Sequence, residues 1–148
     1  MNSEVEVMAK YNKILKDIKK QLGNKTTYSS DLNSLGIRLL GGKFNGVYPA
    51  DKIKISKKQP YCIVNTDTSK GMGEHWCALA KMDNKIIFYD SFARDGVKLI
   101  PQLKNIGLRI INTDDDIEQK ILQSDCGQRS LSFLKFIDMY GAEEAMLI

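Results

Sequence analysis

Long apolar stretches are missing from this 148-residue sequence. No run of apolar residues approaches the roughly 20 residues that a membrane-spanning helix needs, so we expect no membrane association. The opening stretch, MNSEVEVMAKYNK, has no apolar core of the signal-peptide kind, and we expect no secretion by that route. The chain also lacks internal repeats and low-complexity segments. Its length suits one domain with a real hydrophobic core, so we expect a single domain over 1–148.

Cysteine and histidine are both scarce. The three cysteines are Cys62, Cys77 and Cys126, an odd number with no Cys-x-x-Cys pair, and His75 is the only histidine. This pattern predicts a reducing compartment and no disulfide framework. A zinc site built from these four residues would lack the short paired spacings of structural zinc sites. We therefore expect no metal and no required cofactor.

A strong excess of one charge is absent too. The formal net charge is +4 and the isoelectric point is about 8.9. Such a mildly basic surface allows weak, nonspecific contact with nucleic acid but does not argue for it. With 43% hydrophobic and 27% charged residues, the composition is typical of a globular protein.

The N-terminal third predicts one clear helix and then irregular structure. Apolar residues recur at spacings of three and four over 4–22, Ser3 opens a Ser-x-x-Glu capping box, and Gly23 can close the helix. We therefore expect 1–23 to hold an amphipathic helix with a lysine-rich outer face. Residues 24–35 are typical of a loop and a short helix. The glycine-dense stretch 36–53 predicts an irregular connection with short extended pieces.

The middle of the chain predicts β-structure and the end predicts a buried helix. Asp83-Asn84 favours a tight hairpin turn between two strands. Residues 93–107 suit a short helix that crosses over to a further strand, so the sheet should be mixed. From Cys126 the pattern becomes broadly apolar with helical spacing and ends at Gly141. The predicted strands are 61–67, 75–82, 85–92 and 108–114.

Three chemically active side chains fall at the ends of these predicted elements. His75 follows a glycine-rich loop and opens a strand, and Asp90 lies near the end of the next strand. Pairing through the hairpin turn places Trp76 opposite Asp90 or Ser91, so His75 and Asp90 should share one sheet end. Cys126 begins a helix, and a helix N-terminus stabilises the negative charge of a thiolate.

These residue types match the needs of a cysteine nucleophile. The thiolate attacks, a histidine holds it as an ion pair and later protonates the leaving amine, and a carboxylate orients the imidazole. A side-chain amide and the Cys126 backbone N–H could bind the developing oxyanion. Gln119 and Gln123, seven and three residues before the cysteine, are the two candidates for that amide.

The sequence resembles the adenovirus protease family. Its relatives include the SUMO and ubiquitin-like-specific proteases and the capsid-maturation proteases of virophages and Maverick/Polinton elements. The resemblance covers roughly 32–140. The segments that carry it are LNSLGIRLLGGKFNGVYPAD, CIVNT, GMGEHWCALA, IIFYDSF and DCGQRSLSFLKF.

The resemblance implies a fold and a set of catalytic roles. The fold is α+β and papain-like, with a mixed central β-sheet flanked by helices and the nucleophile at a helix N-terminus. His75 corresponds to the general base and acid, Asp90 to the orienting acid, and Cys126 to the nucleophile. Gln119 has the glutamine-to-cysteine spacing of the adenovirus enzyme, so it is preferred over Gln123 as the oxyanion donor.

The resemblance also implies a substrate. Trp76, with Asn65 of the Ile-Val-Asn-Thr segment, is expected to bind glycine residues of the substrate in a narrow cleft, so cleavage should follow glycine. The Leu-Leu-Gly-Gly stretch 39–42 resembles such a cleavage site, but a glycine turn is the preferred interpretation. We expect the C-terminal helices that support DNA and peptide contacts in the adenovirus enzyme to be largely missing, which leaves an activator possible but unsupported.

Three functions stay open at this point. The first is a cysteine endopeptidase that matures viral or virophage precursor polypeptides, acting in the virion or in a viral factory of the host cytoplasm. Small size, the Ile-Val-Asn-Thr and Phe-x-Gly-x-Tyr segments, and an abundance of Lys, Ile and Asn that is typical of AT-rich coding sequences favour it. The second is an isopeptidase that removes ubiquitin-like modifiers. The aspartate at position 90 and the Ser-Asp-Cys-Gly segment favour it, but a chain of this size has little room for a large surface that docks a modifier. The third is an inactive binding scaffold of the same fold, which the complete residue set disfavours.

Overall fold

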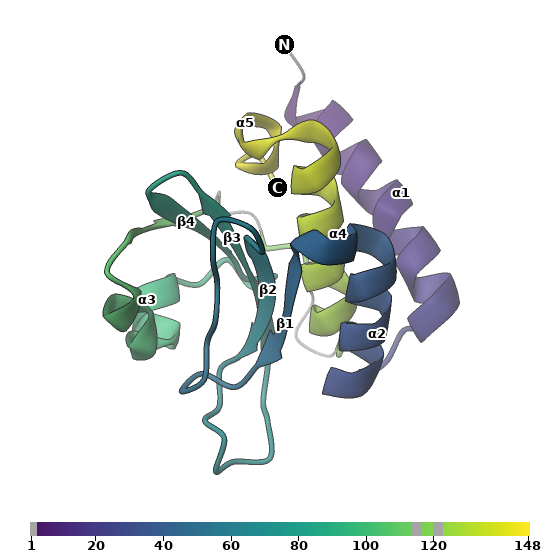
Figure 1. Ribbon diagram of the computed structural model, residues 1–148. Helices are drawn as coiled ribbons and strands as arrows, with labels where there is room; N and C mark the ends of the chain where they lie inside the picture. The colour runs from purple at the N-terminus through teal and green to yellow at the C-terminus, as the bar shows by residue number, and fades with distance from the viewer. Residues whose placement is uncertain (1–2, 114–116, 120–122) are drawn as a thin grey trace.

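The chain folds around a mixed sheet that is covered by helices on both faces. The computed structural model describes residues 3–113, 117–119 and 123–148. The sheet has five strands in the order β1-β2-β3-β4-β5. Helices α1, α2 and α4 cover one face, and the short helices α3 and η2 cover the other (Figure 1). The predicted α+β class with a mixed sheet flanked by helices is therefore confirmed.

The strands lie close to where the sequence places them. β1 pairs with β2, and β4 with β5, in parallel, whereas β2, β3 and β4 are antiparallel neighbours. Ala78 pairs with Tyr89, which is the register that the turn at Asp83-Asn84 predicts. Asp114, the last residue of the predicted fourth strand, lies outside the described residues. The strands are β1 (Phe44–Tyr48), β2 (Tyr61–Asn65), β3 (Trp76–Met82), β4 (Lys85–Tyr89) and β5 (Arg109–Asn112).

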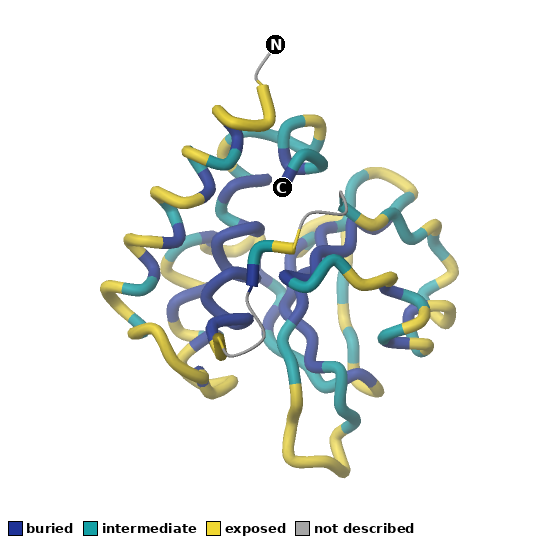
Figure 2. The backbone as a smooth tube through the Cα atoms, turned by 180° about the vertical axis from the view of Figure 1, so that it is seen from behind, coloured by how far each residue is buried: buried dark blue, intermediate teal, exposed yellow. Residues whose placement is uncertain are grey.

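Helix α4 is the central helix of the fold. It contacts α1, α2, β2 and β3, so it is enclosed by other elements on most sides. This explains why its sequence is broadly apolar rather than striped. Figure 2 shows buried backbone along α4 and the central strands, and exposed backbone along the outer side of α1. The helices are α1 (Glu4–Leu22), α2 (Ser29–Leu40), α3 (Gly96–Leu99), α4 (Cys126–Tyr140) and α5 (Ala142–Ala145), with 3-10 helices η1 (Gly41–Lys43) and η2 (Pro101–Ile106).

Helix α1 has the predicted bounds and cap. The Ser3 hydroxyl accepts the Glu6 N–H at 3.2 Å, and the Gly23 N–H bonds the Lys19 carbonyl at the other end. Its buried side chains face α4 and the sheet. In the part of the chain that the structure describes, neither α1 nor any other helix is long and apolar enough to cross a membrane.

The stretch 36–53 is more regular than its glycines suggest. Helix α2 continues through Gly36 to Leu40, and β1 follows directly and adds a parallel strand to the sheet. Gly36 does not break the helix because the Phe44 ring packs against the space that a side chain would fill. Gly41, with φ of 61°, ends α2, so the 39–42 stretch is a glycine turn at a helix end.

We expect Gly36→Ala to lower the free energy of unfolding by about 1–3 kcal/mol. A Cβ at Gly36 would lie 2.5 Å from a ring carbon of Phe44, which is itself buried. This overpacking should outweigh the higher helix propensity of alanine. Urea denaturation measures the change.

Gly42→Ala is the matched control, because a Cβ there meets no atom within 4 Å. Its free energy of unfolding should stay within about 0.5 kcal/mol of wild type. A Gly36→Ala protein as stable as Gly42→Ala would contradict the packing described for α2 and β1.

Candidate active site

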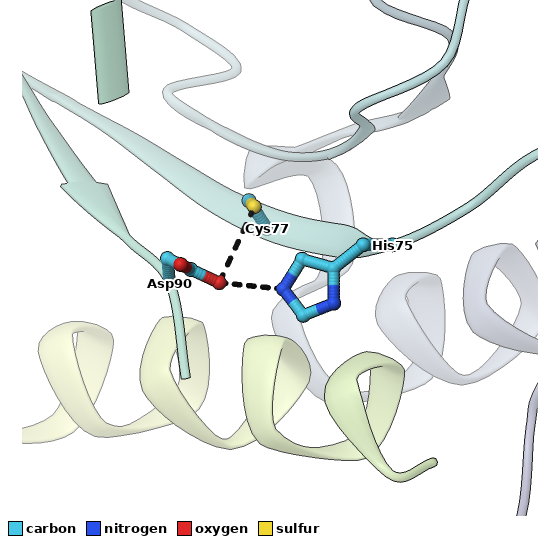
Figure 3. A group of neighbouring side chains, drawn as sticks. All are labelled: His75, Cys77 and Asp90. Atoms are coloured by element: carbon cyan, nitrogen blue, oxygen red, sulfur yellow. Dashed lines mark hydrogen bonds and ion pairs between the residues drawn. The ribbon is translucent and has the colours of Figure 1, made fainter. Parts of the chain in front are cut away.

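The hairpin of β3 and β4 brings His75 and Asp90 together. His75 is the residue before β3, and Asp90 is the residue after β4. His75 Nε2 lies 2.5 Å from Asp90 Oδ1, and both side chains are largely buried (Figure 3). The antiparallel register fixes this proximity, since the two strand ends lie at the same edge of the sheet. Sequence reasoning predicted this pair.

Asp90 has a second cationic partner that sequence reasoning missed. Arg94 donates from Nε to Asp90 Oδ2 at 2.7 Å and from its backbone N–H at 3.1 Å. Burial alone would raise the pKa of Asp90, but the hydrogen bonds from His75 and Arg94 lower it to about 2. Asp90 is therefore a carboxylate at any ordinary pH. The spacing of four residues between Asp90 and Arg94 was the signal in the sequence for this ion pair. The tight turn after β4, which brings Arg94 back to Asp90, was not predicted.

Cys126 is the first residue of α4, as predicted. Its Sγ accepts the backbone N–H of Trp76 at 3.4 Å, which places the thiol beside the start of β3. Asp125 stands at the N-cap, but its side chain makes no capping hydrogen bond. The positive end of the helix dipole is thus left to act on the thiol and on groups that approach it.

His75 interacts with the acid on one side and the thiol on the other. Burial on its own would lower the pKa of His75, but hydrogen bonds with Asp90 and Cys126 and their negative charges raise it to about 9. Asp90 occupies Nε2, so Nδ1 is the ring nitrogen left for the thiol. At neutral pH the imidazole is therefore protonated.

A buried ion-pair network fixes the start of α4. Asp125 binds Lys19 of α1 through Oδ2 at 2.7 Å and Arg129 of α4 through Oδ1 at 3.1 Å. The Tyr11 and Tyr89 hydroxyls, 2.8 Å apart, link α1 to β4 below it. Because Asp125 directly precedes the cysteine, these contacts determine where the thiol lies. Sequence reasoning had assigned Lys19 to a solvated face.

Gly127 explains why a glycine follows the cysteine. A Cβ at this position would overlap Thr27 Oγ1 and lie 3.0 Å from a methyl group of Leu32. The first turn of α4 therefore approaches the segment before α2 more closely than any other residue would permit. The Cys-Gly pair thus places the thiol at a helix start that packs closely against Thr27 and Leu32.

Gln119 is buried beside the sheet rather than exposed. Its Oε1 accepts the Ser91 hydroxyl at 2.5 Å, and its Nε2 donates to the Gln123 carbonyl at 2.5 Å. Its backbone N–H bonds the Ser91 carbonyl, so the segment 117–119 is tied to the residue after Asp90. An amide nitrogen carries two hydrogens, so one N–H of Gln119 is not used by the Gln123 bond. Gln123, the weaker candidate, lies exposed.

Asn65 and Trp76 both line an open cleft of about 440 Å³. Asn65 Oδ1 accepts the backbone N–H groups of Asp67 and Glu74, so this side chain shapes the glycine-rich loop that precedes His75. The Trp76 indole donates to the Thr27 carbonyl at 3.3 Å, and Cys126 and His75 are not among the residues that line the cleft. Tyr28 and Met72, two exposed large side chains, lie along the same cleft.

No protein-family model matches the sequence, and no curated protein matches it significantly. The function is therefore inferred from the geometry and chemistry of the site.

The single histidine makes the electrostatics of the site directly measurable. Because no other imidazole is present, proton NMR of the ring should give a pKa of about 9 for His75. Asp90→Asn removes a negative neighbour, so the pKa should fall by about 1–3 units. Asp17→Asn, on the exposed side of α1, should leave the pKa unchanged.

The raised pKa of His75 also makes the free energy of unfolding depend on pH. The pKa of His75 is higher in the folded protein than the ordinary 6.5, so its contribution is complete below pH 6.5 and is lost as pH rises through about 9. The free energy of unfolding should fall across this interval, and less steeply in Asp90→Asn. Equal slopes in the two proteins, or an unshifted imidazole, would contradict the described contacts.

Proposed function

We propose that the protein is a cysteine endopeptidase with a papain-like arrangement that cleaves precursor polypeptides after glycine. The observation that carries the proposal is the His75 imidazole, which bonds Asp90 at 2.5 Å through Nε2 and interacts with the Cys126 thiol at the start of α4. These three groups come from distant parts of the chain, and each stands at the end of its element. A purely structural role would not require a histidine between a buried acid and a thiol.

The reaction follows from the roles of the three groups. The Cys126 thiolate attacks the scissile carbonyl carbon, and the C–N bond breaks as the His75 imidazolium gives its proton to the leaving amine. An acyl-enzyme thioester results. Neutral His75 then takes a proton from water, hydroxide adds to the thioester, and the acid product leaves as the thiolate and imidazolium re-form. Asp90 holds the ring and stabilises its charged form throughout.

The oxyanion needs donors beside the thiol. The Cys126 backbone N–H lies in the first turn of α4, where it has no partner within the helix. We assign the second donor to the remaining N–H of Gln119, whose carboxamide is held by Ser91 and by the Gln123 carbonyl. A donor fixed in this way stabilises the transition state without reorganising, and its loss typically costs about a hundredfold or more in rate.

The cleft beside Trp76 is the proposed substrate channel. The support for this assignment is Trp76, which is one of the residues that line the cleft and donates its backbone N–H to the Cys126 thiol. The preference for glycine rests on the resemblance to the adenovirus protease family, in which a tryptophan after the histidine narrows the site. The expected substrates are capsid or core precursors of a virus or virophage, in the virion or the host cytoplasm. Weak nucleic-acid contact through the basic surface, or activation by DNA or a peptide, would be secondary.

The aspartate at position 90 favours a second candidate function. SUMO-type isopeptidases use an aspartate where the adenovirus enzyme uses a glutamate. The same nucleophile would then cleave behind the Gly-Gly end of a ubiquitin-like modifier. The two candidates share their chemistry and differ in whether a folded modifier must dock outside the cleft. An inactive scaffold is disfavoured because His75 bonds the acid on one side and interacts with the thiol on the other.

A capture experiment tests the proposal. A short peptide ending in Leu-x-Gly-Gly and a ubiquitin-like protein, each with a thiol-reactive electrophile at its C-terminus, are incubated with the protein and followed by intact mass. We expect one adduct on wild type and none on Cys126→Ala. His75→Ala should label more slowly by about a hundredfold or more. Cys62→Ser is the matched control, because this buried cysteine lies away from the site and should label at the wild-type rate.

The two probes separate the candidate functions. Faster labelling by the short peptide supports the maturation protease, and faster labelling by the modifier supports the isopeptidase. Labelling that persists in Cys126→Ala would overturn the assignment of the nucleophile. Absence of any adduct, also with DNA added, would favour the inactive scaffold.

A further inference from the structure

Cys77 is a third donor group beside the histidine–aspartate pair that the proposed reaction does not use. It is the second residue of β3, and its Sγ lies 3.9 Å from Asp90 Oδ1. Figure 3 shows His75 and Cys77 both directed at the same carboxylate oxygen. Within the described ranges, the His75 nitrogen, the Cys77 sulfur and an Asp90 oxygen all lie within 4.8 Å of one another. One nitrogen, one sulfur and one oxygen donor are the ligand types of zinc.

We propose that His75, Cys77 and Asp90 form a binding site for Zn²⁺ or a similar thiophilic divalent cation, and that its occupancy inhibits the enzyme. The binding part of the proposal stands on the donor geometry alone. The inhibitory part rests on the proposed function. The structural zinc site considered from the sequence would have used all three cysteines. The site proposed here uses one of them and a carboxylate.

The three donor atoms lie within 4.8 Å of one another, so movements of about 1 Å would bring them to the separations of a metal site. Tetrahedral zinc with ligands at about 2.0–2.3 Å separates its donor atoms by roughly 3.3–3.8 Å. The Cys77–Asp90 distance of 3.9 Å is already close to this range. His75 and Asp90, at 2.5 Å, would move apart by roughly 0.8 Å as the cation replaces the proton between them. A small rotation of the His75 ring, which is not fully buried, supplies that movement.

The charges around the site leave one carboxylate oxygen for the metal. Arg94 binds Asp90 mainly through Oδ2, so Oδ1 can turn to a cation without losing that ion pair. A polar cavity of about 200 Å³ reaches Asp90 between Arg94 and Asp95 and offers a route from solvent. The thiol proton of Cys77 and the proton shared by His75 and Asp90 leave to solvent when the cation binds. Burial raises the pKa of the Cys77 thiol, but a coordinated zinc deprotonates a thiol outright.

Zinc at this position would block the proposed reaction because it occupies Nε2, the ring nitrogen that faces Asp90. With Nε2 on the metal, Nδ1 keeps its hydrogen and cannot accept the proton of the Cys126 thiol. The thiolate–imidazolium pair then cannot form, and Asp90 no longer orients the ring. The nucleophile itself stays uncoordinated, which distinguishes this site from a metal bound directly by Cys126 and His75.

Competition with a chromogenic zinc chelator measures the affinity without requiring activity. We expect wild type, Cys62→Ser and Cys126→Ser to bind zinc with similar affinity. Cys77→Ser should bind at least about tenfold more weakly, since loss of even an outer-shell partner can cost that much. Cys62→Ser is the matched control, because Cys62 is an equally buried cysteine on the neighbouring strand. Added Cd²⁺ should shift the single imidazole signal in wild type and less in Cys77→Ser.

The results of these experiments test the zinc site and the proposed protease function separately. Zinc binding that is lost in Cys126→Ser and kept in Cys77→Ser would overturn the proposal, as would no binding to wild type. If the binding pattern is as expected, zinc should also slow labelling by the peptide probe in wild type and Cys62→Ser, relative to zinc-free protein, and less in Cys77→Ser. Labelling that zinc leaves unchanged would overturn the inhibitory role alone. A protein that binds zinc as expected but never labels would refute the protease and keep the metal site.

Discussion

The buried contact between His75 and Asp90 is the interaction on which the rest of the site depends. Removing a carboxylate and an imidazolium from water is costly unless both are paired and hydrogen-bonded. Here the acid has Arg94 on its second oxygen, and the imidazole has the Cys126 thiol on its other side. Asp90, His75 and Arg94 therefore stabilise one another's charged forms. The Cys126 thiol on the other side of the imidazole is the observation on which the proposed catalytic role rests.

Helices α1 and α4 hold the Cys126 thiol next to the His75–Asp90 pair. β3 and β4 position the acid and base, whereas Cys126 arrives on a separate helix that must be held against their ends. Asp125 does this through Lys19 and Arg129, and Gly127 permits the close approach. The N-terminal helix is thus part of the support of the proposed active site. Its Lys19 contributes an ion pair to Asp125, the residue before the proposed nucleophile.

The sequence predicted the features that depend on interactions between residues close together in the chain. The hairpin register follows from a short turn and strand alternation, and α1 follows from its cap and apolar spacing, so the His75–Asp90 pair could be placed in advance. The short helix expected within 24–35 is α2, but its extension through Gly36 to Leu40 was missed, because a glycine at that place looks like a helix breaker. The parallel pairing of β1 with β2 is a long-range contact that leaves no local signature. Arg94 was missed for a different reason: it lies only four residues from Asp90, but the contact depends on the tight turn after β4, which was not foreseen.

The most direct test of the account is a double-mutant cycle on the rate of probe labelling, with His75→Ala, Asp90→Asn and both together. If Asp90 acts through His75, the double variant should label no more slowly than His75→Ala alone, because the acid has no base left to orient. Additive losses would mean that the two residues act independently. That result would contradict the claim that His75, Asp90 and Cys126 form one catalytic unit.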